Sequence, residues 1–487
     1  MAKTSKKEAR AGVTEILALL RHAFPPAQSV HFLIALVTLR WLADARRDSV
    51  PLPCPLELPS CLEYHVPLTL HEDQLGHWFE AMFKQLEDAN RHELSGLFSG
   101  LDFTSPRFRS DDEGRSLLMR AVEILWFKDR YQCSFELMKE ALALSRSCLV
   151  AGFSAPEFNT PAPLCELTAK LMQAQAGETV YDPACGTGQM LIHCEGTLKC
   201  SPKQVRLFGA EPHATAWTLA KVSALYHGFS SEHIGMSDSL QPDNVLEADD
   251  GQRKFDVVIA HPPWGVKEWR AENPPPERYE RFRRGMPPKN NGDYAYLLHM
   301  VASMKDDSGR MVAIVSSGVL SRGAQEGRIR MRLIKDDLVD AVIALPEKMF
   351  QGTPVGGAML VMRRNRSHRD VLFIDARGFA TGAAGKNIFS PQAIEWISHA
   401  CAIRKSEPGV SALAGIDDIV ENGYSLSVSL YIRAEQENTS TDIHAIRSRR
   451  KKLHDELGGI NQQIDDLLDT VMSGDARHGR KLGAGLA

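Results

Sequence analysis

The chain has 487 residues, a net charge of −4 at pH 7, 43% hydrophobic and 24% charged residues, the balance of a soluble globular protein. This length predicts about two to four domains, and the acidic balance excludes the overall basic character of a protein that binds nucleic acid unaided. The longest apolar stretch, His31–Ala43, is too short to cross a membrane, and the nine scattered cysteines show no metal-binding spacing, so we expect a cytoplasmic protein with reduced thiols and no metal site.

Residues 1–150 are predicted to form an N-terminal helical domain. Pro-rich breaks at Pro51–Pro59 and Ser105–Pro106 divide it into separate helices. Apolar residues recur at helical spacing in three segments, Val13–Phe24, Val30–Ala45 and Gly114–Phe127.

A different pattern begins near Pro156, where short β-branched runs alternate with helical segments. The predicted strands are Thr179–Tyr181, Val205–Ala210, Phe255–Ala260, Arg310–Ser316, Leu338–Leu345 and Gly357–Met362. The predicted helices between them are Pro163–Gln175, Ala214–His227, Tyr294–Lys305 and Gln325–Lys335. Most of these strands are apolar throughout, as expected between two helix layers. The alternation predicts a doubly wound, Rossmann-like α/β domain over residues 151–435.

Residues 436–487 are predicted to form a helical tail. Apolar side chains recur at steps of three and four, at Leu453, Leu457, Ile460, Ile464, Leu467 and Val471. A basic run precedes them, formed by Arg447, Arg449, Arg450, Lys451 and Lys452. The apolar seam fits either a helix that packs on its own domain or one that contacts a partner subunit, and both interpretations stay open.

The first predicted strand leads into the sequence Asp-Pro-Ala-Cys-Gly-Thr-Gly, from Asp182 to Gly188. Glycines at positions 186 and 188, on either side of Thr187, let the backbone turn sharply and approach a ligand. In such folds the ligand lies beyond the carboxyl ends of the strands. Taken alone, this pattern fits an ordinary tight turn equally well.

Three acidic residues near the predicted strand ends favour a nucleoside ligand. Glu211 ends the second strand, about 23 residues after Gly188, where a carboxylate can accept hydrogen bonds from both ribose hydroxyls. Asp238 lies between two serines and fits an adenine amino group, or an ordinary turn. Asp182 suits the ammonium of a methionine moiety better than a pyrophosphate. These features predict S-adenosyl-L-methionine as the cofactor.

The strand Phe255–Ala260 leads into His261-Pro262-Pro263-Trp264. Two consecutive prolines hold the backbone rigidly after a buried strand. The aromatic residue that follows is placed to stack on a base taken out of the duplex. The alternative is a Pro-rich strand exit without a function.

Together, these two motifs resemble the signatures of the amino-methyltransferases of nucleic acids. Further motifs resemble the modification subunits of type I restriction–modification systems, over about residues 150 to 432. They are Glu157–Pro161 (Glu-Phe-Tyr-Thr-Pro in the family), Asp293–His299, Gly318–Leu320, Ile329–Arg330, Ala341–Pro346, Phe350–Thr353, Phe373–Ala376 and Asn422–Leu426. The resemblance implies methyl transfer to adenine N6 in double-stranded DNA, although cytosine-N4 enzymes share the same loop. It also implies that Phe158, Asn159, Thr160 and Pro161 contribute to the cofactor site.

Two positions depart from the family pattern. Asn159 replaces a tyrosine, and His261 replaces the Asn, Asp or Ser whose side-chain oxygen accepts a hydrogen bond from the target amino group. Neutral imidazole offers one acceptor nitrogen and imidazolium offers none. Activity should therefore fall as the pH drops through the pKa of His261, near 6.5 if unperturbed. The alternative function is a catalytically impaired scaffold that binds cofactor and clamps DNA.

The segment between Trp264 and Asp293 combines basic and aromatic residues. They are Lys267, Arg270, Arg278, Arg281, Arg283, Arg284 and Lys289, with Trp269, Tyr279 and Phe282 among them. This composition predicts contacts with phosphates and bases, although four glutamates also fit a solvated loop. The resemblance implies a separate DNA specificity subunit and a hetero-oligomer with two copies of this chain, and it leaves open a restriction nuclease subunit.

Overall fold

The computed structural model describes residues 2–63, 65–108, 116–126, 134–153, 160–193, 205–241, 247–248, 251–270, 279–350, 355–383, 386–432, 448–453, 455–460 and 462–464. The contacts group the chain into two compact units, Met1–Arg433 and Ala434–Ala487. Several predicted features lie outside the described residues, namely Phe158, Asn159, the loop residues 271–278, residues 351–353, and Leu467 and Val471 of the tail.

The N-terminal region is helical, as predicted. Its longer helices are α1 (Ala2–Ala23), α2 (Pro26–Arg47), α4 (Glu72–Ala89), α6 (Leu117–Trp126) and α7 (Ser134–Phe153), with the short α3 (Val66–Thr69) and α5 (Arg91–Leu94) between them. Helix α2 is buried along most of its length, because the other helices pack around it. The region also packs on the following domain, since the ring of Phe135 stacks on that of Tyr226 at 4.2 Å.

Nine of the described strands of the second region form one sheet in the order β13-β10-β8-β9-β7-β6-β1-β2-β3. Neighbouring strands run parallel, except that β9 is antiparallel to both its neighbours and β13 to β10. The strands are β1 (Thr179–Asp182), β2 (Arg206–Ala210), β3 (Ile234–Gly235), β6 (Val257–Ala260), β7 (Arg310–Ser316), β8 (Val339–Ala344), β9 (Gly357–Arg363), β10 (Val371–Asp375) and β13 (Ser411–Ala414). Two separate hairpins pair β4 (Glu247–Ala248) with β5 (Gly251–Gln252) and β11 (Ala380–Ala383) with β12 (Lys386–Phe389). All six predicted strands are present with small shifts at their ends, whereas β3, β10 and β13 were not among the predicted strands.

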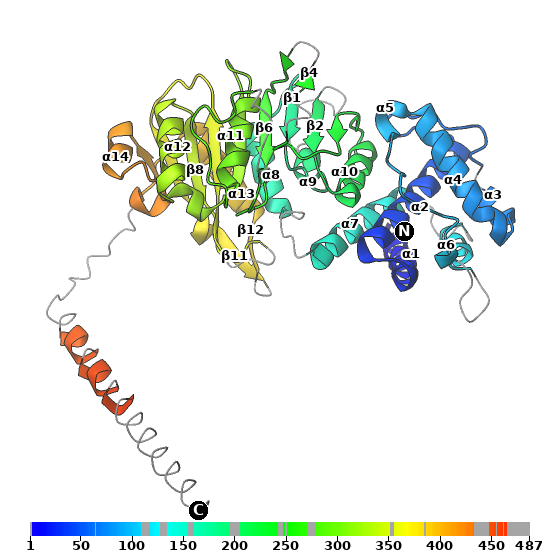
Figure 1. Ribbon diagram of the computed structural model, residues 1–487, viewed down its shortest axis with the longest axis horizontal. Coiled ribbons are helices and arrows are strands. Elements are labelled where there is room, and N and C mark those ends of the chain that lie inside the picture. Colours follow the sequence, from blue (N-terminus) through cyan, green and yellow to red (C-terminus); the bar gives the residue numbers. More distant parts are fainter. Residues whose placement is uncertain are drawn as a thin grey trace, which may run out of the picture. The chain divides into compact units, whose positions relative to one another are not determined.

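Helices cover both faces of this sheet, because alternate residues of each strand contribute to two separate apolar cores. One core contains α8 (Ala162–Met172), α9 (Gln189–His193), α10 (Ala214–Tyr226), α13 (Pro391–Ile403) and the N-terminal helices. The other contains α11 (Asp293–Ser303), α12 (Ala324–Lys335) and α14 (Ile416–Glu421) (Figure 1). The predicted doubly wound α/β fold is therefore confirmed.

The strand order defines where a ligand can bind. From β1 the chain moves outward through β2 and β3, then returns to β6 on the other side of β1 and continues to β7. Strands β1 and β6 thus form the point where the winding reverses, and their carboxyl ends lie side by side. Doubly wound folds bind their ligands at this position. Asp182 ends β1 and His261 follows β6, so the topology brings the two predicted motifs together.

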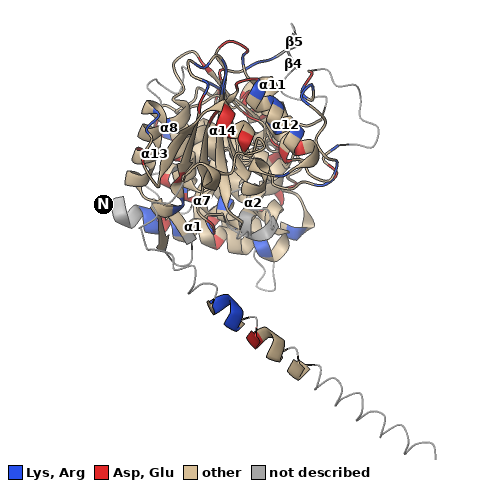
Figure 2. Ribbon diagram, turned by 90° about the vertical axis from the view of Figure 1, so that its left-hand side faces the viewer, with Lys and Arg blue, Asp and Glu red and all other residues tan. Residues whose placement is uncertain are grey.

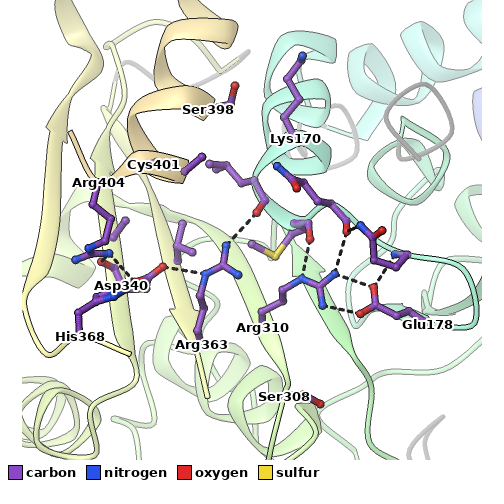
Figure 3. Close-up of a pocket in the computed structure, with 17 residues that line it drawn as sticks. Lys170, Glu178, Ser308, Arg310, Asp340, Arg363, His368, Ser398, Cys401 and Arg404 are labelled. Atoms are coloured by element: carbon purple, nitrogen blue, oxygen red, sulfur yellow. Dashed lines mark hydrogen bonds and ion pairs between the residues drawn. The ribbon is translucent and has the colours of Figure 1, made fainter. Parts of the chain in front are cut away.

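A cavity of about 630 Å³ lies at the opposite edge, where the parallel strands begin (Figure 3). Two arginines that line the cavity stabilise the fold. Arg310 pairs with Glu178 at 2.7 Å and donates to the carbonyl of Met172 at 2.6 Å. Arg363 donates to the carbonyl of Leu171 at 3.2 Å. These carbonyls belong to the last turn of α8, where no intrahelical donor is available. The guanidinium groups therefore cap α8.

The described residues of the second unit, 448–453, 455–460 and 462–464, are helical, as predicted for the tail. This helix begins with basic residues, whereas in the first unit Lys and Arg are interspersed with Asp and Glu (Figure 2). Its apolar seam is exposed at Leu453, Leu457, Ile460 and Ile464. Within the described part of the chain, no helix is both long and apolar enough to span a membrane.

Candidate functional site

The turn after β1 has the geometry expected of a close approach to a ligand. Gly186 and Gly188 have φ angles of +54° and +76°, which L side chains rarely adopt. A Cβ at Gly188 would also lie 3.1 Å from the Cα of Ala220 in α10. The carboxylate of Asp182 is 2% exposed and accepts a hydrogen bond from the Ala184 amide at 3.0 Å. The turn therefore packs tightly and holds a buried acid at its entrance.

Glu211 lies beside this turn and supports it. Its Oε2 accepts a hydrogen bond from the Gly186 amide at 3.1 Å, and its Oε1 accepts one from the His213 amide at 2.8 Å. The side chain is 3% exposed. Sequence reasoning assigned Glu211 only to the ribose, and the structure adds a second role, because this carboxylate joins the ends of β1 and β2.

Two buried acids next to each other alter the chemistry of Asp182. Burial, together with the charge of Glu211, raises the pKa of Asp182 from 3.8 to about 8, while the hydrogen bond from Ala184 acts in the opposite direction. The fold therefore disfavours the charged form of Asp182.

Asp238 follows β3 and forms a turn. Its carboxylate accepts hydrogen bonds from the Leu240 amide at 2.9 Å and from the Gln241 side chain at 3.3 Å. This geometry satisfies the turn interpretation and leaves the adenine role a prediction. Among the described residues, three buried oxygens near these strand ends have no hydrogen-bond partner: Thr187 Oγ1, Gln189 Oε1 and Ser237 Oγ. Buried polar atoms are normally paired, so these atoms fit a polar ligand at this edge.

His261 directly contacts the motif Glu157–Pro161 that the family resemblance assigned to the cofactor site. Its ring is 5% exposed, and Nδ1 lies 3.0 Å from the hydroxyl Oγ1 of Thr160. Burial lowers the pKa of His261 from 6.5 to about 4. The acid limb predicted for activity therefore moves well below the unperturbed value of 6.5, because the ring has no nearby charge to offset its loss of solvent. Pro161, next to Thr160, is the N-cap residue of α8, which positions the Thr160 hydroxyl.

The rest of the His-Pro-Pro-Trp motif is held by an aromatic cluster. Pro262 is buried and Pro263 half-buried. The Trp264 indole donates to the carbonyl of Ile314 at 3.2 Å, and its ring centroid lies 4.9 Å from that of Phe350. Phe350 also lies 5.1 Å from the His261 ring. Trp264 is therefore held at the carboxyl end of β6 by these contacts.

Sequence reasoning did not assign Phe350 or Gly357 to the site. Phe350 begins the Phe-Gln-Gly-Thr motif, and that motif is the signal that identifies it. A Cβ on Gly357 would lie 2.8 Å from the Phe350 ring and 3.1 Å from the Trp264 ring. The aromatic cluster therefore requires glycine at the start of β9.

Asp293, the first residue of α11, supports the same loop. Its Oδ1 accepts a hydrogen bond from the Gly265 amide at 2.6 Å. Its Oδ2 accepts from the Ser316 hydroxyl at 3.1 Å and from Arg322 at 2.5 Å. The side chain is 4% exposed. Asp293 thereby joins the end of the Pro-Pro-Trp segment to the carboxyl end of β7.

The described basic residues between Trp264 and Asp293 differ in exposure, and Arg270 is half-buried beside the sulfur of Met286. Lys267, Arg283 and Lys289 are exposed, as phosphate contacts require. Arg281 and Arg284 are buried, at 5% and 6% exposure, and Arg284 pairs with Asp336 at 2.6 Å. The predicted phosphate-binding role therefore fits only the exposed group, because the buried guanidiniums are engaged within the protein.

Comparison with known proteins gives a consistent result. The N-6 DNA methylase family model matches residues 142–440. The MjaVIII type I restriction enzyme methylase subunit of Methanocaldococcus jannaschii is 29% identical over 76% of this chain and 66% of its own length. The MpnII type I methylase subunit of Mycoplasma pneumoniae is 27% identical over 78% of this chain and 73% of its own length.

A solved structure supports the same assignment at the level of the fold. The type I restriction–modification methyltransferase subunit of Streptococcus thermophilus matches with a TM-score of 0.73 and 22% identity, over 88% of this chain and all of that chain. The resemblance to type I modification subunits is confirmed. Because the family model covers more than half of the sequence, including both strand-end motifs, the chain belongs to the N-6 DNA methylase family.

Proposed function

We propose that this chain transfers a methyl group from S-adenosyl-L-methionine to the N6 atom of adenine in double-stranded DNA. The observation that carries the proposal is the position of His261-Pro-Pro-Trp264 at the end of β6, next to the buried acid that ends β1. A base bound at one strand end then faces a cofactor bound at the neighbouring one. Family membership supports this choice of reaction over the scaffold alternative.

Three acidic residues at the strand ends would each bind a different part of the cofactor. Asp182 would accept the ammonium group, Glu211 the ribose hydroxyls, and Asp238 the adenine amino group. The unpaired oxygens of Thr187, Gln189 and Ser237 offer further polar contacts. S-adenosyl-L-methionine supplies a methyl group activated by a positively charged sulfur.

On the base side, the target amino group needs acceptors for its hydrogens. If the Thr160 hydroxyl accepts from Nδ1–H of His261, the lone pair at Nε2 is available to the target amino group. The carbonyl of Pro262 is the second acceptor implied by the family resemblance. Two such bonds keep the amino lone pair available for the methyl group. Trp264 would stack on the flipped base.

Methyl transfer tests the proposal directly. The chain, alone and with any protein that co-purifies, is incubated with duplex DNA and methyl-labelled cofactor. We expect label in DNA, and digestion of that DNA to nucleosides should yield N6-methyladenine. Label recovered as N4-methylcytosine would change the substrate, and a complex that binds cofactor and DNA without any transfer would contradict the proposal.

We further propose that a DNA specificity subunit, with or without a nuclease subunit, joins this chain through the exposed seam of the tail. Deleting residues 440–487 is expected to abolish co-purification with that partner and to leave cofactor binding intact, because the tail forms a unit separate from Met1–Arg433. Pull-down and calorimetry measure the two properties. A truncated chain that still assembles fully would assign the seam to contacts within its own chain.

A further inference from the structure

A network of buried hydrogen bonds joins the two sides of the proposed active site. Arg281, in the loop that follows the Pro-Pro-Trp segment, donates through Nη1 to the carbonyl of Ser239 at 3.1 Å and to Nδ1 of His299 at 3.3 Å. His299, in α11, contacts the hydroxyl of Tyr181 through Nε2 at 3.0 Å. Tyr181 immediately precedes Asp182 in β1. All four residues are at most 5% exposed.

The direction of these hydrogen bonds follows from their chemistry. A guanidinium group can only donate, so Nδ1 of His299 must accept. Burial and the charge of Arg281 hold the pKa of His299 well below its usual value, so the ring is neutral and carries its proton on Nε2. Nε2 therefore donates to the Tyr181 hydroxyl. Each contact in this hydrogen-bond network therefore has one compatible orientation.

The hydrogen-bond network connects the cofactor side of the proposed active site with the DNA side. Ser239 follows Asp238, the residue proposed to accept the cofactor's adenine amino group. Arg281 belongs to the loop proposed to meet DNA. We infer that Arg281 is a positioning residue that couples cofactor binding to DNA binding, by fixing the loop on the DNA side to the turn on the cofactor side. This inference rests on the proposed function and adds a structural explanation for how cofactor binding affects DNA binding.

Arg281 is distinguished from its neighbour Arg283 by burial. Arg283 is exposed, two residues away in the same loop, and is suited to a phosphate contact. Removing Arg281 would leave the buried Ser239 carbonyl and His299 nitrogen without this donor. The loop on the DNA side and the turn on the cofactor side would then lose this connection. Removing Arg283 would weaken DNA binding without changing how the cofactor affects it.

The test is a binding cycle on the full chain with its co-purifying partner. The dissociation constant of S-adenosylhomocysteine is measured by calorimetry with and without a duplex oligonucleotide. Coupling between two sites commonly changes affinity by about 5- to 150-fold. We expect at least about a fivefold effect of DNA in the wild type and less than about twofold in Arg281→Ala. Arg281→Lys, which keeps a charged donor, should retain part of the coupling.

The control is Arg283→Ala, which should bind DNA more weakly, depend less on salt and keep the wild-type coupling factor. Circular dichroism checks that each variant is folded, and Arg281→Lys provides the comparison if the alanine variant is not. Wild-type coupling retained in a folded Arg281→Ala would overturn the inference, as would a wild type that binds cofactor and DNA without coupling. If only Arg281→Lys is folded, a coupling factor equal to that of the wild type would overturn it. A wild type that binds no cofactor would instead overturn the proposed function.

Discussion

Asp182→Asn is expected to abolish cofactor binding and, at the same time, to stabilise the protein without cofactor. The carboxyl group is 2% exposed, and its pKa of about 8 shows that the fold disfavours its charged form. An amide keeps an acceptor for the Ala184 amide but cannot pair with an ammonium group. We expect no heat of binding with S-adenosylhomocysteine, and a gain of roughly 2–4 kcal/mol in unfolding free energy near pH 7, on the linkage relation.

The pH dependence has a definite sign. A carboxyl group whose pKa is higher in the folded than in the unfolded state stabilises the fold fully below the unfolded value, near 3.8, and this contribution is lost as the pH rises to about 8. Wild-type stability should therefore decrease over this range relative to Asp182→Asn. Melting temperatures of both proteins across the range measure the difference. Parallel curves would show that Asp182 is already ionised and paired without cofactor.

Asp256→Asn is the matched control. Asp256 is also buried, at 9% exposure, but lies at the opposite edge of the sheet. It accepts hydrogen bonds from the Thr179 amide at 2.9 Å and from Lys305 at 2.6 Å, and these partners outweigh its burial to hold its pKa below 3.8. This substitution should destabilise the protein and leave cofactor binding unchanged. Loss of binding in both variants would point to a general loss of structure.

Most of the sheet could be predicted from the sequence because its strands are short apolar runs between helix layers. Strands β1, β2, β6 and β7 were identified to within two residues, and their polar end residues fell at one edge because parallel strands share a direction. Strand β13 was missed because its sequence, Ser-Ala-Leu-Ala, has no β-branched residue. Helix α13 has a recognisable start, since Ser390 accepts a hydrogen bond from the Ala393 amide and Pro391 follows it.

The motifs of the site could be predicted from the sequence, but the contacts between its residues could not. Phe350 reaches His261 and Trp264 because β9 inserts antiparallel between β7 and β8, which no local pattern indicates. Arg281 carried no signal that distinguishes it from the exposed basic residues around it. The pKa of His261 depends on complete burial without a charged neighbour, and this property appears only when the chain has folded.

Substitutions of His261 are expected to give the largest change in turnover. If its ring accepts a hydrogen bond from the target amino group, His261→Ala removes that acceptor and should reduce the methylation rate on the order of 10²-fold or more, as loss of a preorganised hydrogen bond does in other enzymes. His261→Asn restores a side-chain oxygen at this position, as in the family pattern, and should retain activity. Single-turnover methyl transfer at saturating DNA and cofactor measures the chemical step in each variant.

The pH profile then identifies how His261 acts. With a pKa of about 4, the ring is neutral throughout the range from about pH 5 to 9, so wild-type and His261→Asn rates should have the same shape there. The lowered pKa of His261 also makes the stability of the fold sensitive to acid. The neutral ring contributes fully to stability above its pKa in the unfolded state, 6.5, and this contribution is lost as the pH falls towards 4. Circular dichroism at each pH therefore separates loss of chemistry from unfolding.

An acid limb near pH 6.5 in the wild type that disappears in His261→Asn would show that the ring is solvated during turnover. A wild type inactive at every pH, beside an active His261→Asn, would establish the scaffold function for the natural chain.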